Sequence, residues 1–113
     1  MPDDAATVLD IVLACRRLRR FVEGVDEAAF QKNEEKRWAA FSQLLLIGEA
    51  ATRLSAAFRA GHDSIPWRQI TAMRNRLIHE YDRSNCHLVW RTATEDLPRL
   101  LTELEPVAPK PDA

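Results

Sequence analysis

The run Leu44-Leu45-Leu46-Ile47-Gly48-Glu49-Ala50-Ala51 lies in the middle of residues 33–60, a segment that contains no proline. Residues 44–47 would make a helix apolar on all sides, and such a helix needs other elements packed against more than one of its faces. One long central helix is therefore predicted over residues 33–60. Gly48 and Ala51 are small and three residues apart, so a neighbouring helix backbone could come close here.

A first helix is predicted before this central one. Apolar residues recur at spacings of three and four, the pattern of an amphipathic helix, at Val8, Ile11, Cys15, Leu18 and Val22. Asp3 or Asp4 can cap this helix, and Gly24 is expected to end it. Asp26 can then cap a short second helical segment.

Two further helices are predicted after the central one. Gly61 is expected to end the central helix, and Pro66 suits the first turn of the next. Asn85 can cap a last helix that begins near Cys86. Pro98 lies inside that helix and removes a backbone donor, so a kink or restart is expected there.

The whole pattern predicts an all-α protein, because no run of alternating apolar and polar residues supports a strand. We expect an up-and-down bundle of four to five helices over residues 1–105. Residues 106–113 contain three prolines and no apolar period, and are predicted to form a disordered tail.

Composition describes an ordinary globular chain of 113 residues, 46% hydrophobic and 29% charged, which is enough for one domain. No apolar run approaches the roughly 18 residues that cross a bilayer, and the acidic residues 1–4 differ from a secretory signal. A cytoplasmic location is expected. Cys15 and Cys86 have no CxxC spacing, so both are expected to be reduced thiols.

The net charge of −1 provides no overall basic field for nucleic acid. A local candidate exists at the end of the first helix, where Arg16, Arg17, Arg19 and Arg20 cluster. The alternative is a solvated helix face whose cations are favourably placed near a helix C-terminus.

The richest chemistry lies in residues 73–81, where the candidate site residues are Arg74, Asn75, Arg76, His79 and Tyr81. Arginine is always charged and forks onto phosphate oxygens, and histidine exchanges protons near neutral pH. This combination suits phosphodiester chemistry without a metal. No cofactor is expected, since the histidines lack zinc-ligand spacing and residues 79–80 lack the second histidine of HExxH.

A helical wheel separates these side chains. Arg74 falls within an apolar stripe, whereas Asn75 and His79, four residues apart, share another face. Arg74 and His79 are about 140° apart around an ideal helix. The helix could unwind near His79, the Arg74 stem could curl round, or the two residues could meet across two subunits.

Glu49 next to the apolar run of the central helix would be costly to bury unless paired. We expect it to pair with Arg74 or another motif residue, the alternative being a plain surface position. Arg74 and His79 could likewise be only an interhelical ion pair and a cap. Tyr81 could be an aromatic residue at the edge of the core.

Arg74, His79 and Tyr81 resemble the Arg-x4-6-His signature of HEPN-domain ribonucleases, in the form with an added tyrosine that marks the HepT-like toxin family. The resemblance extends over residues 8 to 104, through the ordered blocks Leu9-Asp10-Ile11, Ile47-Gly48-Glu49-Ala50-Ala51, Ile65-Pro66-Trp67-Arg68, Val89-Trp90 and Asp96-Leu97-Pro98. One departure is Asn85, where the family often carries an acidic residue.

This resemblance implies a homodimer in which two motifs line one cleft, and an endoribonuclease that cuts tRNA or mRNA without metal. His79 would exchange protons with the 2′-hydroxyl or the leaving 5′-oxygen, and Arg74 would stabilise the phosphorane. Asn75 would orient the imidazole or a phosphate, with Arg76 and Glu49 in support.

The resemblance also implies a partner, a minimal nucleotidyltransferase antitoxin that transfers AMP to Tyr81. The leading prediction is thus the toxin half of a toxin-antitoxin module. The competing prediction is a non-catalytic helical dimer that binds a nucleotidyltransferase or RNA.

Overall fold

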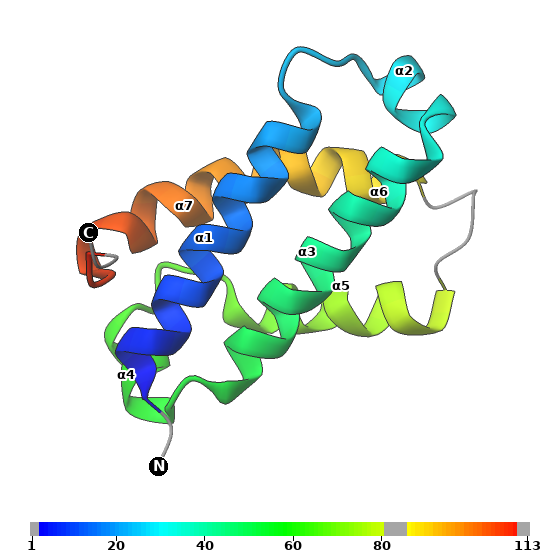
Figure 1. The fold of residues 1–113 in the computed structure, drawn as a ribbon. Helices are drawn as coiled ribbons and strands as arrows, with labels where there is room; N and C mark the ends of the chain where they lie inside the picture. Colours follow the sequence, from blue (N-terminus) through cyan, green and yellow to red (C-terminus); the bar gives the residue numbers. More distant parts are fainter. Residues whose placement is uncertain (1–2, 81–85, 111–113) are drawn as a thin grey trace.

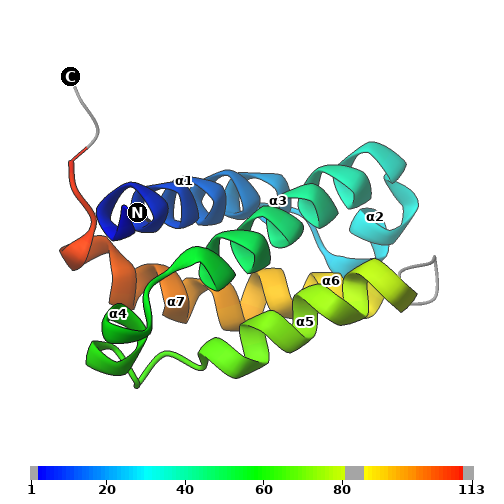
Figure 2. The ribbon, with the colours of Figure 1, turned by 90° about the horizontal axis from the view of Figure 1, so that it is seen from below.

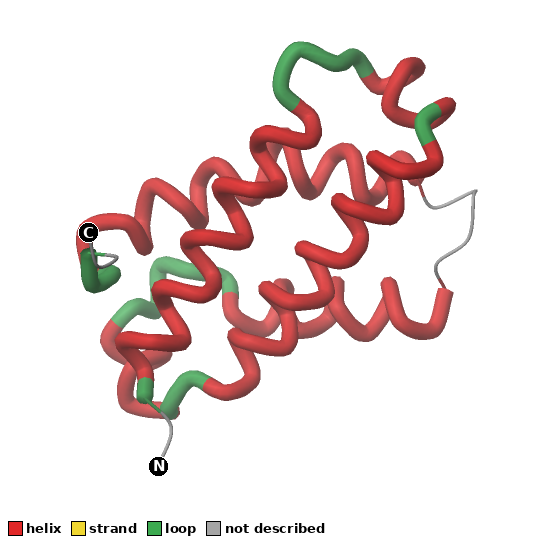
Figure 3. The backbone as a smooth tube through the Cα atoms, in the orientation of Figure 1, coloured by secondary structure: helices red, strands yellow, loops and turns green. Residues whose placement is uncertain are grey.

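A computed structural model of the chain describes residues 3–80 and 86–110. The described residues are mostly helical and include no strand, as Figure 3 shows. The helices are α1 (Asp4–Val22), α2 (Glu27–Lys32), α3 (Glu34–Arg53), α4 (Ala56–Gly61), α5 (Trp67–Glu80), α6 (Cys86–Arg91) and α7 (Leu97–Leu104). The all-α prediction is confirmed.

Helix α3 lies at the centre of the bundle, where it packs against α1, α5 and α6. It runs antiparallel to α1 at its side, and α5 crosses it in the opposite direction (Figures 1 and 2). Helices α6 and α7 follow one another along the back of the bundle, and α7 also packs against α1. Leu44 and Ile47 are fully buried, which explains the apolar run that marks α3 in the sequence.

The first two helices form as their caps predict. The carboxylate of Asp3 accepts from the Ala6 N–H at 3.2 Å, and that of Asp26 accepts from the Ala29 N–H at 2.8 Å. All five apolar residues of the predicted α1 stripe are buried. Gly24 has φ of 72°, in the left-handed region that glycine adopts without a steric penalty, and turns the chain towards α2.

The predicted single helix over residues 33–60 is wrong, because the chain breaks at Leu54 and Ser55 into α3 and α4. The Ser55 hydroxyl caps α4 by accepting from the Phe58 N–H at 3.0 Å. The Ser55 N–H and hydroxyl in turn donate to the carboxylate of Asp4, at 2.9 and 2.6 Å. A tether from the start of the chain therefore ends α3.

The expected restart at Pro98 takes the form of a π-helical segment, Thr92–Asp96, between α6 and α7. The Leu97 N–H donates to the Thr92 carbonyl, five residues back, so the hydrogen-bond ladder shifts just before the proline. Pro98 then stands in the first turn of α7, where a missing N–H is tolerated.

The described residues extend past α7 to residue 110. A 3-10 turn, Glu105–Val107, follows α7, and Ala108 packs against the core. Residues 111–113 of the predicted tail, and the predicted cap Asn85, lie outside the described residues. In the described part, no helix combines the length and apolar character needed to span a membrane.

Candidate functional site

The candidate site begins where α5 crosses α3 at Gly48. A methyl group at Gly48 would come within 2.7 Å of Arg74 Cγ, and still closer to its Cβ. Only a residue without a side chain fits between the two helices at that point. The stem of Arg74 is therefore fixed against the backbone of α3.

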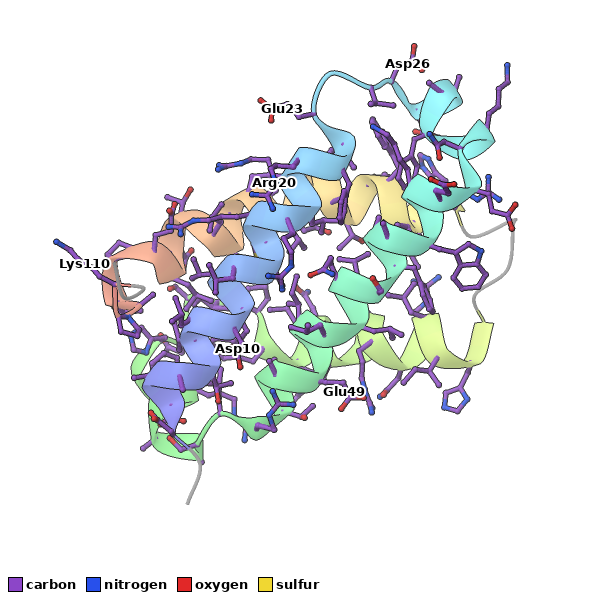
Figure 4. The ribbon with its side chains drawn as sticks, viewed as in Figure 1. Asp10, Arg20, Glu23, Asp26, Glu49 and Lys110 are labelled. Atoms are coloured by element: carbon purple, nitrogen blue, oxygen red, sulfur yellow. The ribbon has the colours of Figure 1, made fainter. Side chains whose placement is uncertain are left out.

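The Arg74 guanidinium is held by two neighbours. Its Nε donates to Glu49 Oε1 at 2.8 Å, and its Nη2 donates to the same oxygen. Its Nη1 donates to Asn75 Oδ1 at 2.8 Å. The expected ion pair between Glu49 and Arg74 is thus present, and Figure 4 shows Glu49 on the part of α3 next to α5.

This network lies at the surface rather than in the core, because the Arg74 and Glu49 side chains keep 27% and 45% of their exposure. A guanidinium has five N–H donors. Three are used in these bonds, so Nη1 and Nη2 each have a second N–H for another acceptor. Arg74 is therefore oriented while still able to bind an oxyanion.

His79 lies in the last turn of α5 and is exposed. It has no hydrogen-bond or ion-pair partner among the described residues. Asn75 is also exposed, one turn earlier on the same face of the helix. Asn75 therefore lies between the two, since its side chain accepts a hydrogen bond from Arg74 and His79 follows it by one helical turn.

The difficulty posed by the helical wheel persists in the structure. Helix α5 stays regular through Glu80, so the helix does not unwind near His79. The Arg74 guanidinium turns to Glu49 and Asn75. Arg76 is exposed on α5, and Tyr81 lies outside the described residues.

The arginine cluster of α1 is partly occupied within the chain. Arg16 pairs with Glu105 at 2.7 Å, and Arg17 donates to Gln43 at 2.8 Å. Arg19 and Arg20 are exposed in the last turn of α1, and Figure 4 shows Arg20 towards the opposite end of the bundle from Glu49. These contacts favour the solvated-face interpretation.

Cys15 and Cys86 are both buried, and they are not joined by a disulfide bond. Burial, with a smaller contribution from the negative charge of Glu105, raises the pKa of Cys15 to about 12. This thiol is therefore protonated at neutral pH and a poor nucleophile.

Two pockets flank α5. One of about 460 Å³ lies between α5 and α7, over apolar residues that include Ile70 and Leu100. Of the described candidate residues, Arg74, Asn75, Arg76 and His79 do not line it. The other, of about 510 Å³, is lined by Asn75 together with Arg59 and Arg68. Sequence reasoning missed these two arginines, although Arg68 lies two helical turns before Asn75, a spacing that places both on one face.

Comparison with known proteins gives a consistent result. A sequence model of the family described as "Ribonuclease HepT-like" matches residues 11–107. "Putative RNase TTE0752" of Caldanaerobacter subterraneus subsp. tengcongensis is 33% identical over 100 residues, covering 88% of this chain and 89% of that protein. "Probable ribonuclease HepT" of Thermococcus cleftensis is 31% identical over 96 residues, covering 85% and 87%. No solved structure matches the chain.

Proposed function

The chain belongs to the ribonuclease HepT-like family, and from this premise we propose that it is a metal-independent endoribonuclease, the toxin of a toxin-antitoxin pair. Its substrate is tRNA or mRNA in the cytoplasm. One observation carries the proposal. A guanidinium already oriented by Glu49 and Asn75 lies at the surface, on the same helix as an exposed histidine.

The chemistry follows from these two groups. A histidine removes the proton from a 2′-hydroxyl, the 2′-oxygen bonds to phosphorus, and the bond to the 5′-oxygen breaks as that oxygen receives a proton. Arg74 stabilises the extra negative charge of the phosphorane through its remaining N–H groups. The products are a cyclic phosphate and a free 5′-hydroxyl.

A dimer resolves the separation of Arg74 from His79. On a regular α5 the two side chains diverge by about 140°, so Arg74 of one protomer acts with His79 of the partner subunit. Two large apolar side chains on the helices that carry the site support such an interface. Trp38 on α3 is 53% exposed, and Ile78, adjacent to His79, is 46% exposed.

Silencing by the antitoxin acts at Tyr81. A minimal nucleotidyltransferase transfers AMP from a nucleotide to the tyrosine hydroxyl and releases the remaining phosphates. The new phosphodiester puts negative charge and bulk two residues from His79. Substrate phosphate is then repelled and blocked. Intact mass of the co-expressed protein should increase by whole AMP units, and an unchanged mass would contradict modification.

The enzymatic proposal is tested by His79→Ala, with His87→Ala as the matched control. Both histidines are exposed, but His87 on α6 contacts Glu27, away from α5. We expect His79→Ala to lower the rate of RNA cleavage by about 10²–10⁴-fold without changing the dimer or the melting temperature. His87→Ala should cleave at the wild-type rate.

The competing function is a non-catalytic dimer that binds RNA or a nucleotidyltransferase. The Arg74–Glu49 ion pair favours it, because a paired arginine can serve structure alone. Equal cleavage or equal growth inhibition by His79→Ala and wild type would support the non-catalytic dimer and overturn the proposed endoribonuclease.

A further inference from the structure

The pocket next to the candidate site is an open basin of about 510 Å³ over the second half of α4 and residues 67–75 of α5. It is lined by Arg59, Trp67, Arg68, Thr71, Ala72 and Asn75. Two of these residues carry positive charge and none carries negative charge. The basin is therefore a local cationic surface on a chain whose net charge is −1.

Both guanidinium groups are available to a ligand. Within residues 3–80 and 86–110, neither Arg59 nor Arg68 makes an ion pair or side-chain hydrogen bond. This differs from Arg16 and Arg17, which are satisfied within the chain. Each free guanidinium presents five donors in a planar fork that matches phosphate oxygens.

The backbone beneath the two arginines is held rigidly. The rings of Phe58 and His62 stack with centroids 4.2 Å apart, and Trp67 packs against Phe58. The Trp67 indole N–H donates to the His62 carbonyl at 3.0 Å. Arg59 and Arg68 directly follow two of these residues, so their backbone positions are fixed relative to each other.

The basin continues towards the candidate site. Arg68, Ala72, Asn75 and His79 are spaced by three and four residues and form one stripe along α5. At 1.5 Å per residue, the stripe from Arg68 to His79 is about 16 Å long. That is several times the rise of about 3.4 Å per nucleotide of a stacked strand. Asn75 belongs to the basin and also binds Arg74.

We infer that this basin is a substrate subsite that binds backbone phosphates of the RNA strand beside the scissile phosphate. The inference rests on the proposed function and extends it. Arg59 and Arg68 neutralise phosphates beyond the cleaved bond, and the Thr71 hydroxyl provides a further donor. RNA is favoured over an acidic protein because Arg68 of the basin lies on the same stripe of α5 that ends at His79.

The test is the double variant Arg59→Gln/Arg68→Gln, with Arg19→Gln/Arg20→Gln as the matched control. Both remove two positive charges from exposed or half-buried helix positions. Steady-state cleavage is measured on a single-stranded oligoribonucleotide and on a dinucleotide, which has no phosphate besides the scissile one. The KM for the oligoribonucleotide is also measured as a function of salt.

For the oligoribonucleotide, we expect the KM of the basin variant to rise about tenfold, with its dependence on log salt reduced by about 1.4 for two lost phosphate contacts. Cleavage of the dinucleotide should not change. Arg59→Lys/Arg68→Lys should restore most of the salt dependence, because it keeps the charges. The control should behave as wild type.

An unchanged KM, an equal effect of the control, or an equal loss on the dinucleotide would overturn the subsite. So would intact RNA cleavage with lost binding of the nucleotidyltransferase, since that result would assign the basin to a protein partner. Failure of the proposed function is distinguishable, because the wild-type protein would then cleave neither substrate.

Discussion

Arg74 and His79 are five residues apart on one helix, yet their surroundings differ completely. Arg74 is pressed against Gly48 and bonded to Glu49 and Asn75. His79 is exposed at the end of α5 without a partner among the described residues. One half of the candidate site is thus organised by the protomer itself. For the other half, around His79, we propose that a second protomer and RNA supply the missing contacts.

For the half of the site around His79, a large effect on dimerisation is expected at Ile78. Ile78→Gln removes an exposed apolar side chain beside His79, and an apolar residue at the centre of an interface contributes about 2 kcal/mol. We expect the dimer to weaken by about thirtyfold or more. Cleavage should fall with it and recover at higher protein concentration. Sedimentation and cleavage assays over a concentration series measure both.

Val107→Gln is the matched control, because Val107 is similarly exposed, at 44%, but lies in the 3-10 turn after α7. It should change neither association nor cleavage. If Ile78→Gln dimerises as the wild type does, then Ile78 is not part of the interface, and the half of the site around His79 would have to be completed in some other way.

The packing of Arg74 against α3 is disrupted most directly by Gly48→Ala. The added methyl group overlaps the Arg74 stem, so we expect the free energy of unfolding in urea to fall by about 1–3 kcal/mol. Cleavage should also fall, because α5 moves away from α3 and carries Arg74 with it. Gly61→Ala is the control, since a methyl group there meets no atom within 4 Å. Equal stability of the two variants would mean that the crossing is not tight.

A smaller effect on stability and cleavage is expected from Glu49→Gln, which tests what the ion pair with Arg74 contributes. The pair is partly exposed, so its loss should change the free energy of unfolding by less than about 1 kcal/mol. Cleavage should fall by less than about tenfold as the guanidinium becomes less well oriented. Glu95→Gln, in the exposed pair with Arg91 at 3.0 Å, is the control and should leave cleavage intact. Faster cleavage by Glu49→Gln would indicate that Glu49 competes with substrate.

The smallest effect on stability is expected at Asp4, whose carboxylate accepts hydrogen bonds from Ser55 at the break between α3 and α4. Hydrogen bonds from Ser55 lower the pKa of Asp4 below 3.8. A lowered pKa stabilises the folded state above that value, and the stabilisation is lost as pH falls through the folded-state pKa. Asp4→Asn should therefore be less stable than wild type at pH 7, with the difference shrinking below pH 3.8. Urea titrations at several pH values measure this.

Asp3→Asn is the control for Asp4→Asn, because asparagine caps a helix as well as aspartate does. It should be as stable as wild type at neutral pH. A stability difference between Asp4→Asn and wild type that persists unchanged in acid would contradict the proposed contribution of the Asp4 carboxylate.

Features of the fold that depend on neighbouring residues could be predicted from the sequence, whereas features that depend on residues far apart in the chain could not. The buried face of α1, the caps of α1 and α2, and the pairing of Glu49 with Arg74 depend on spacing and on the cost of an unpaired carboxylate. Such signals can be recognised in the sequence of a single chain. The break at Ser55 cannot, because residues 33–60 otherwise favour a helix and the break depends on Asp4, 51 residues away.

The candidate site follows the same rule. Residues 74, 75 and 79 are recognisable from the motif on one helix. The basin needs Arg59 from α4 as well, and so it becomes visible only when the turn through His62 and Trp67 brings α4 beside α5. We propose that Arg74 meets His79 across two protomers, an arrangement that the pattern of one chain does not determine.

The most direct measurement mixes two inactive variants, Arg74→Ala and His79→Ala, after unfolding and refolding them together. If each site takes Arg74 from one protomer and His79 from the other, a mixed dimer contains one intact site. Random pairing puts half of the protein in mixed dimers, so we expect the mixture to recover about a quarter of wild-type RNA cleavage. Verified mixed dimers that remain as inactive as either variant alone would contradict a site shared between protomers.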